Sequence, residues 1–179
     1  LPAGSPFIVS AVSRKTHGLA GAFDMDISVP GAVESRLNGP TQIIVTFDRV
    51  IDGADGLDNG GVLISSGTIH AVVISDSTLT IDMSGVADCS ALTIRFPGIV
   101  SQTGGASASQ ALCFGVLRGD VQEDGATNVM DLLATKNVLN HPLDSSNYQC
   151  DINIDGNLNV LDLLVIRNNL NAKIATACP

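Results

Sequence analysis

Aromatic and basic side chains are scarce in this sequence: its 179 residues include no Trp, one Tyr and five Phe, and only 9 Lys and Arg stand against 18 Asp and Glu. The formal net charge of -9 argues against nucleic acid as a partner, because such proteins carry a basic face that neutralises phosphates. No apolar run approaches the roughly 20 residues that a membrane-spanning helix needs. With 45% apolar residues, we expect a soluble, acidic protein with a packed core.

The four cysteines lack the spacings that bind zinc or haem, and an even number suits disulfides formed in an oxidising compartment. Position suggests two pairs. Cys89 and Cys113 flank the last two expected strands, and a bond between Cys150 and Cys178 would clip the C-terminal tail to the segment before it. The sequence starts with neither Met nor a signal pattern, which indicates a processed mature end. We therefore expect a secreted, extracellular or cell-surface protein.

Common catalytic motifs are also missing. There is no HExxH, GxSxG, phosphate-binding loop or dinucleotide fingerprint, and His17, His70 and His141 lie in unrelated contexts, so we expect no enzyme. A pair of acids for glycoside hydrolysis and a carbohydrate-binding role stay open, although all five Phe fall at strand positions that look buried. The run Ser-Arg-Lys-Thr-His-Gly at 13–18 is interpreted as a solvated strand end with a turn, or as a site for an anionic group; the first is favoured.

Short apolar runs alternate with Gly, Ser, Asn and Asp over the first two thirds of the chain. Within 23–29 every second residue is apolar, which is the period of a strand with one buried face. The expected strands are 7–13, 23–29, 42–47, 61–64, 68–74, 78–83, 91–96 and 111–117. Because turn signals separate them and no helical window intervenes, we predict an antiparallel, immunoglobulin-like β-sandwich over residues 1–117.

After residue 117 the pattern changes to that of two short amphipathic helices, at 131–139 and 162–170. This part of the chain also repeats itself: 120–140 aligns with 151–171, and about half of the aligned positions are identical. No spacer separates it from the last expected strand, so we expect the two parts to hold a nearly constant relation.

Each repeat opens with a 12-residue loop of the kind that surrounds Ca²⁺ with oxygens from positions 1, 3, 5, 7, 9 and 12, with Gly at position 6. The expected ligands are Asp120, Gln122, Asp124, the Ala126 carbonyl, Asn128 and Asp131 in the first loop, and Asp151, Asn153, Asp155, the Asn157 carbonyl, Asn159 and Asp162 in the second. The acids of each loop repel one another unless cations lie between them. Two Ca²⁺ would bring the net charge to about -5.

A third acidic loop contains Asp52, Asp55 and Asp58 among glycines. It has two interpretations: a third calcium site, or a plain surface hairpin, which is favoured.

Duplicated loops that end in Asp, each followed by one helix with a Leu pair and a base, resemble the dockerin family over 119–140 and 150–171. The resemblance implies a small α-helical, dockerin-like module over residues 118–179, with two calcium loop-helix units related by approximate two-fold symmetry. It also implies a β-sandwich partner called cohesin. The implied partner-facing residues are Val129, Met130, Lys136, Val160, Leu161 and Arg167. Well-known dockerins often carry Ser-Thr at the loop pair, and the apolar residues here indicate a more hydrophobic contact.

The same four apolar residues are equally well interpreted as core, since so small a unit has little else to bury. We expect the helix leucines in the core: Leu132, Leu133, Leu139, Leu163, Leu164 and Leu170. In the N-terminal part, 12–18, 23–27 and 114–120 resemble a cohesin-like β-sandwich segment that precedes dockerin-like repeats in secreted proteins of environmental bacteria. That likeness implies no activity.

Two functions follow as hypotheses. The dockerin-like module docks onto the β-sandwich of the next copy, and such a head-to-tail contact builds an extracellular filament, a homo-polymer, when its rotation does not close. Alternatively, the chain is an accessory subunit, carrying a ligand such as a carbohydrate, that is attached through its dockerin to a separate cohesin scaffold.

Overall fold

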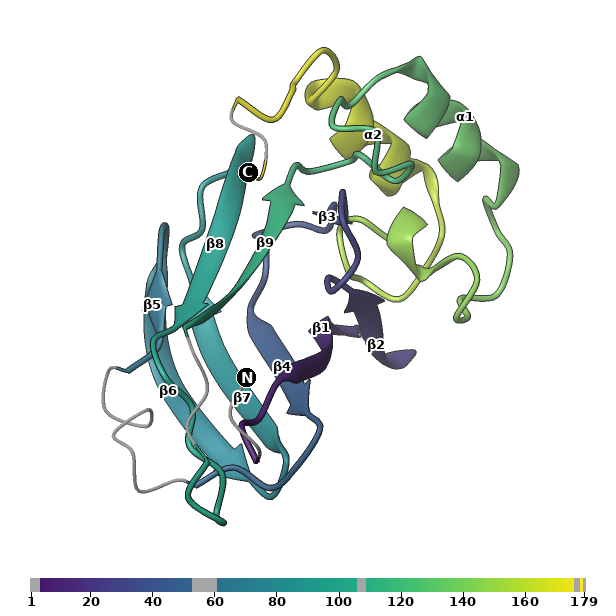
Figure 1. Ribbon diagram of the computed structural model, residues 1–179. Helices are drawn as coiled ribbons and strands as arrows, with labels where there is room; N and C mark the ends of the chain where they lie inside the picture. Colours follow the sequence, from purple (N-terminus) through teal and green to yellow (C-terminus); the bar gives the residue numbers. More distant parts are fainter. Residues whose placement is uncertain (1–3, 53–60, 106–108, 176–177, 179) are drawn as a thin grey trace.

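The computed structural model describes residues 4–52, 61–105, 109–175 and 178. In these residues the strands form two sheets, of order β2-β1-β4-β7-β6 and β3-β9-β8-β5, and two short helices follow at one end of the sheets (Figure 1). The strands are β1 Ile8–His17, β2 Gly21–Asp26, β3 Val33–Glu34, β4 Gln42–Phe47, β5 Leu63–Ile64, β6 Thr68–Ser75, β7 Thr78–Ser84, β8 Ser90–Phe96 and β9 Gln110–Val116.

The pairing is mostly antiparallel; in the described part of the chain β3 and β9 alone run parallel. Buried side chains of both sheets belong to one core cluster, which includes Ile43 of β4, Ile81 of β7 and Phe114 of β9. Along β4 and β7 buried and half-buried residues alternate, as expected for strands with one face on a core. We call this part, from β1 to β9, the β-rich region.

Two features of the sheets differ from the prediction. β1 continues to His17, beyond the expected end at residue 13, and β3 was not expected at all. The added part of β1 pairs with β2, so that Lys15 lies opposite Phe23. Its inward-facing members, Ser13, Lys15 and His17, are polar but buried. Their side chains bond to polar groups, Ser13 to Glu34, Lys15 to the Leu37 carbonyl and His17 to Asp151, which is why a hydrophobic pattern does not find them.

The helices α1 (Val129–Asn137) and α2 (Val160–Asn168) begin with the same cap. The side chain of Asn128 accepts a hydrogen bond from the Met130 amide, and the carboxylate of Asp131 accepts from the Asn128 amide. Such a reciprocal box satisfies amides that the first helical turn leaves unpaired. Both helices therefore start two residues before their predicted positions. A short 3-10 helix, η3 (Tyr148–Cys150), precedes the second loop. None of the described helices has the length and apolarity to cross a membrane.

The cysteines pair differently from both predictions. Cys113 of β9 is bonded to Cys178, whereas Cys89 and Cys150 are free thiols. The predicted pairs Cys89–Cys113 and Cys150–Cys178 are therefore wrong. The register of β8 and β9 places Cys113 opposite Thr93, four residues along the strand from Cys89.

The path of the C-terminal tail explains the observed bond. After α2 the tail returns to the β-rich region, where the Ala175 amide donates to the Cys89 carbonyl at 3.0 Å. The side chain of Ile174 packs against Gly115 of β9, so closely that a Cβ on the glycine would lie 2.4 Å from it. Cys178 thus ends beside β9 and away from Cys150.

We expect Cys178→Ser to lower the free energy of unfolding by about 2–4 kcal/mol, because the bond joins residues with a sequence separation of 65 and long closed loops restrict the unfolded chain most. Urea denaturation followed by circular dichroism measures this. Cys89→Ser is the matched control and is expected to cost no more than about 0.5 kcal/mol. Thiol titration of the unfolded, unreduced protein should find the two free cysteines; four thiols would contradict the pairing.

Candidate metal loops and docking surface

The two loops have the same local geometry, built around the carboxylate of their first residue. Asp120 accepts hydrogen bonds from the amides four and five residues later, at 3.1 and 2.8 Å, and Asp151 does the same at 3.2 and 2.9 Å. The second donor in each case is the loop glycine, Gly125 or Gly156, with φ of +82° and +86°. Glycine adopts this left-handed backbone without strain, so the glycines allow each loop to close around its first carboxylate.

The last residue of each loop ties its end to its beginning. Asp131 accepts from the amides of Gln122 at 3.1 Å and Asn128 at 2.8 Å, and Asp162 accepts from those of Asn153 at 3.2 Å and Asn159 at 3.0 Å. Each of these carboxylates also lies in the first turn of its helix, where the helix dipole favours negative charge. The loops and the helix starts therefore form one hydrogen-bonded unit each.

The carboxylates that open and close the loops are all fully buried: Asp120, Asp131, Asp151 and Asp162. Burial raises the pKa of Asp120 and of Asp162 to about 6, although backbone amides donate to both and lower it in part. Within the described residues no Lys or Arg pairs with any of the four. Buried carboxylates are costly to ionise without a cation, so the loops suit a bound positive charge.

Of the other oxygens expected to bind calcium, only some lie close to one another in each loop. In the first loop the side-chain nitrogen of Asn128, Nδ2, donates to the carboxylate of Asp124 and to the Ala126 carbonyl, both at 3.1 Å. This brings the two acceptor oxygens close to each other. Asn159 does the same in the second loop. The side-chain oxygen of each of these two asparagines caps the helix. No three acidic, His or Cys side chains of the described residues gather in one metal cluster, so amide and carbonyl oxygens would have to complete a calcium shell.

The third acidic loop lies mostly outside the described residues, which exclude Asp55 and Asp58. The amide of Asp52 donates to the Val100 carbonyl at 2.8 Å. The prediction of a third calcium ion stays untested.

The expected partner-facing residues lie on the surface. Val129, Met130, Val160 and Leu161 are between 50% and 68% exposed, and Lys136 and Arg167 are exposed as well. The alternative interpretation of the four apolar residues as core is therefore wrong for this chain.

The leucines expected in the core also differ from the prediction. Leu133, Leu164 and Leu170 are exposed, and Leu132, Leu139 and Leu163 are only half-buried. The fully buried positions of the helices are instead Asp131 and Thr135 in α1, and Asp162 and Ile166 in α2. The helices thus turn their loop-closing carboxylates inward and leave an apolar face outward. We call Val129, Met130, Leu133, Val160, Leu161 and Leu164 the apolar surface.

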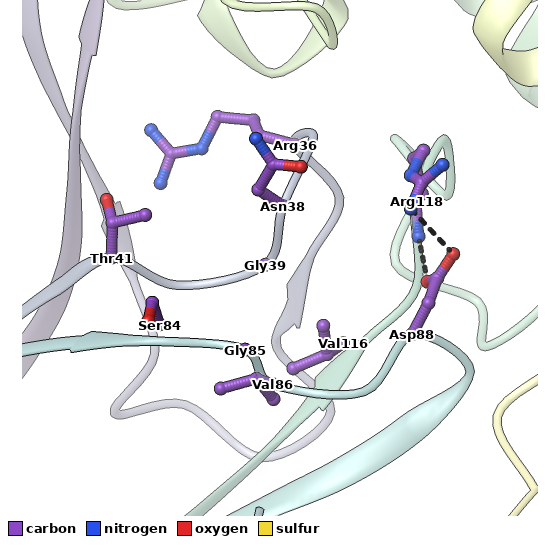
Figure 2. Close-up of a pocket in the computed structure, with 10 residues that line it drawn as sticks. All are labelled: Arg36, Asn38, Gly39, Thr41, Ser84, Gly85, Val86, Asp88, Val116 and Arg118. Atoms are coloured by element: carbon purple, nitrogen blue, oxygen red, sulfur yellow. Dashed lines mark hydrogen bonds and ion pairs between the residues drawn. The ribbon is translucent and has the colours of Figure 1, made fainter. Parts of the chain in front are cut away.

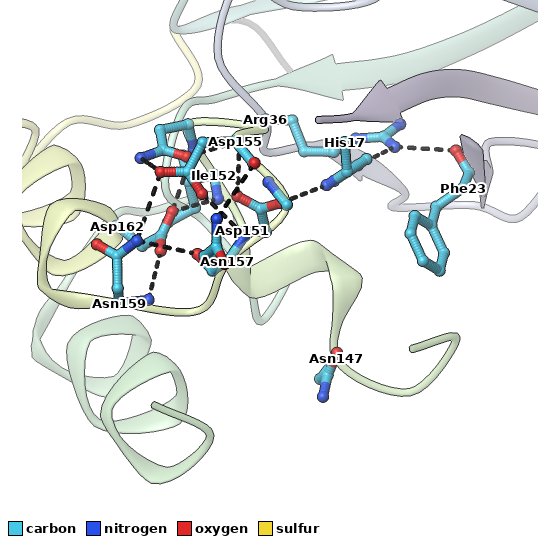
Figure 3. Close-up of polar contacts among 12 residues, drawn as sticks. His17, Phe23, Arg36, Asn147, Asp151, Ile152, Asp155, Asn157, Asn159 and Asp162 are labelled. Atoms are coloured by element: carbon cyan, nitrogen blue, oxygen red, sulfur yellow. Dashed lines mark hydrogen bonds and ion pairs between the residues drawn. The ribbon is translucent and has the colours of Figure 1, made fainter. Parts of the chain in front are cut away.

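A buried polar cluster that sequence reasoning missed joins the second loop to the β-rich region (Figure 3). Its centre is His17, whose Nδ1 lies 2.9 Å from the Asp151 carboxylate and whose Nε2 lies 3.3 Å from the Arg36 guanidinium. Arg36 in turn forms a two-pronged ion pair with Glu34 at 2.7 Å, and all four residues are fully buried. Residues 13–18 form a strand end with a turn, as predicted, but the prediction that it is solvated is wrong for Ser13, Lys15 and His17, which are buried. Residues 13–17 are all polar, so no alternation of polarity in the sequence marks the three that are buried.

Aromatic rings close the same junction. Tyr148 of η3 stacks on Phe23 of β2, with ring centroids 5.3 Å apart, and its hydroxyl donates to the Asp24 carbonyl at 2.9 Å. The Leu37 amide donates to the Ile152 carbonyl at 2.8 Å. The second loop is thus in direct backbone and side-chain contact with the β-rich region.

A cavity of about 460 Å³ opens beside the start of β4 and the end of β9 (Figure 2). Its lining residues are Arg36, Asn38, Gly39, Thr41, Ser84, Gly85, Val86, Asp88, Val116 and Arg118. They include one carboxylate, that of Asp88, which pairs with Arg118 at 3.5 Å, so the lining lacks the carboxylate pair that most glycoside hydrolases use. Phe7, expected to be buried, is 44% exposed, but it lies outside this lining.

Residues 118–172 match the family model described as the dockerin type I domain. The chain therefore has a dockerin-type region in its C-terminal part, after the β-rich region, and α1, α2 and both loops lie within it.

Comparison with solved structures gives weaker likenesses, and no curated protein matches the chain. The N-terminal part of the bacterial S-layer protein SbsC has 16% identity and a TM-score of 0.42, over 63% of this chain and 24% of that one. The S-layer protein rSbsC(31-844) has 16% identity and a TM-score of 0.41, over 63% and 14%. The chain spans about a quarter or less of these proteins, and such likeness identifies no function for it.

Proposed function

We propose that this protein is a secreted bacterial calcium-binding protein that docks onto a β-sandwich partner through its dockerin-type region. The observation that carries the proposal is the apolar surface, which presents equivalent residues of the two repeats at nearly equal exposure. These large apolar side chains are exposed on both α1 and α2, and apolar patches exposed to solvent mark protein–protein interaction sites. Dockerins bind cohesins, and this agrees with the match over residues 118–172.

Two Ca²⁺ ions belong to the proposal, one in each loop, with the ligands expected from the loop positions. Calcium supplies positive charge beside the buried carboxylates. Asp131 and Asp162 link each loop to its helix start, so an ordered loop keeps α1 and α2 in place and with them the apolar surface. The β-rich region is proposed to be a β-sandwich, and no reaction is assigned to the chain.

A second copy of the chain is the first proposed occupant of the apolar surface. The second loop packs on the β-rich region of its own chain, while the apolar surface stays uncovered, so its contact has to come from another molecule. A β-rich region offers a partner of the kind that dockerins bind. Head-to-tail docking of this type yields a filament when the rotation does not close. The alternative is attachment to a separate cohesin scaffold, with the β-rich region carrying a ligand.

Light scattering and electron microscopy in millimolar calcium, and then in EDTA, test whether a second copy of the chain occupies the apolar surface. Calcium-dependent polymers are expected for self-docking. A monomer near 18.4 kDa in both conditions excludes it, and surface plasmon resonance against a panel of cohesin domains then tests the alternative. A monomer that binds no cohesin in calcium would contradict docking.

We expect the double variant Met130→Asp/Leu161→Asp to weaken docking about 100-fold or more, because it places a charge in both halves of the apolar surface. Ser145→Asp is the matched control, since Ser145 is exposed in the dockerin-type region and lies outside both the apolar surface and the β-rich region. Equal binding by the double variant and the control would show that docking uses another surface.

A further inference from the structure

The second loop is not built by the dockerin-type region alone. We infer that His17 of β1 is a positioning residue for the second calcium site, so that calcium in this loop also fastens the dockerin-type region to the β-rich region. The inference rests on the calcium ions of the proposed function, but not on any docking partner.

The hydrogen bonds of His17 set its tautomer. A guanidinium has donors only, so the Arg36 nitrogen at 3.3 Å from Nε2 donates to it, and Nε2 accepts. The ring proton therefore lies on Nδ1, which donates to the Asp151 carboxylate at 2.9 Å. The edge-to-face contact with Phe23, whose ring centroid is 5.2 Å away, holds the imidazole in this orientation. His17 is thus a preset donor aimed at the first residue of the loop (Figure 3).

The first loop provides an internal comparison. In the described residues the carboxylate of Asp120 accepts from backbone amides only, whereas Asp151 accepts the same two backbone bonds and a third from His17. Groups that hydrogen-bond to a metal ligand orient it, and their loss typically costs about 10–100-fold in metal affinity. The two loops are therefore alike in sequence, but the first carboxylate of the second loop accepts one more hydrogen bond, from His17.

The backbone around the second loop leaves no free space at the junction. A Cβ on Gly18, which has φ +48°, would lie 2.2 Å from the Asp155 carbonyl oxygen, and one on Gly156 would lie 2.8 Å from the His17 carbonyl oxygen. The Leu37 amide donates across the same junction to Ile152. Because binding and ordering are reciprocally linked, calcium that orders this loop also protects the junction.

Calcium titration of the full chain by calorimetry, together with hydrogen exchange at the Leu37 amide, tests the inference. We expect His17→Leu to lower the calcium affinity of one of two sites by about tenfold or more and to abolish the slowing of Leu37 exchange by calcium. His17→Asn, whose amide group supplies a donor near the position of Nδ1, should recover part of both. Unchanged affinities in His17→Leu, with exchange at Leu37 still slowed by calcium, would overturn the inference.

A second pair of variants keeps His17 in place and needs no change in the β-rich region. Asp151→Asn is expected to remove the calcium effect on Leu37 exchange, and its counterpart Asp120→Asn in the first loop is expected to keep it. Equal behaviour of the two variants would overturn the inference, while docking to a partner could still be observed. Absence of any calcium binding to the unaltered protein would instead overturn the calcium sites themselves.

Discussion

Arg36→Met is expected to lower the free energy of unfolding by about 3–5 kcal/mol, because it leaves the buried Glu34 carboxylate without its partner. Burial alone would raise the pKa of Glu34, but the hydrogen bonds and charge of Arg36 bring it below its usual value. The stabilisation from the ionised pair is therefore complete above pH 4.5 and is lost as the pH falls below that value. Urea denaturation at pH 7, and at intervals down to pH 3, measures both effects.

An exposed ion pair of the same type provides the control. Arg14 forms a two-pronged contact with Asp24 at 2.6 Å, but both side chains are at least a third exposed, so Arg14→Met should cost at most about 1 kcal/mol. The double variant Arg36→Met/Glu34→Leu removes both buried charges and should regain much of the loss. Comparable losses in the Arg36 and Arg14 single variants would contradict the argument.

Removal of calcium is expected to lower the free energy of unfolding of the dockerin-type region by about 5 kcal/mol. Each bound calcium ion contributes about 2.7 kcal/mol when free calcium is 100 times its dissociation constant. Two loops, whose buried carboxylates pair with no Lys or Arg of the described residues, therefore contribute about twice that. Differential scanning calorimetry in saturating calcium and in excess EDTA measures the change, and circular dichroism at 222 nm follows α1 and α2.

The double variant Asp120→Asn/Asp151→Asn is the control for chelation. It lacks the first carboxylate of both loops, so its melting should be nearly the same with and without calcium. Identical melting of the unaltered protein in the two conditions would show that the loops hold no calcium under those conditions.

Sequence patterns predicted those elements whose residues alternate in a regular way. β4 has its predicted bounds, 42–47, because every second side chain faces the apolar core. The repeat identified both loops and both helices, since loop geometry depends on short-range residues such as Gly125 and Gly156. β3 has only two residues, too few to show a period.

Other features depend on what a segment packs against, which a pattern of polarity does not reveal. His17 is buried because it faces a polar loop distant in sequence, and Arg36 because it pairs with Glu34 and His17. Leu133 is exposed although it lies on an apolar helix face. The bond between Cys113 and Cys178 depends on the return path of the tail. Apolar periodicity predicts that a side chain will be covered, but it does not distinguish a core from an intermolecular contact.

The bond between Cys113 and Cys178 also determines how mechanical load travels through the molecule. The chain leaves β9 into the dockerin-type region, and the tail comes back to the same strand, so both ends of that region are anchored on β9. Tension applied at Cys178 passes through the disulfide directly into the sheet and bypasses the loops and helices. A protease that cuts once between these cysteines likewise leaves the two pieces covalently joined. The dockerin-type region is thereby shielded from tension that is applied through the C-terminal tail.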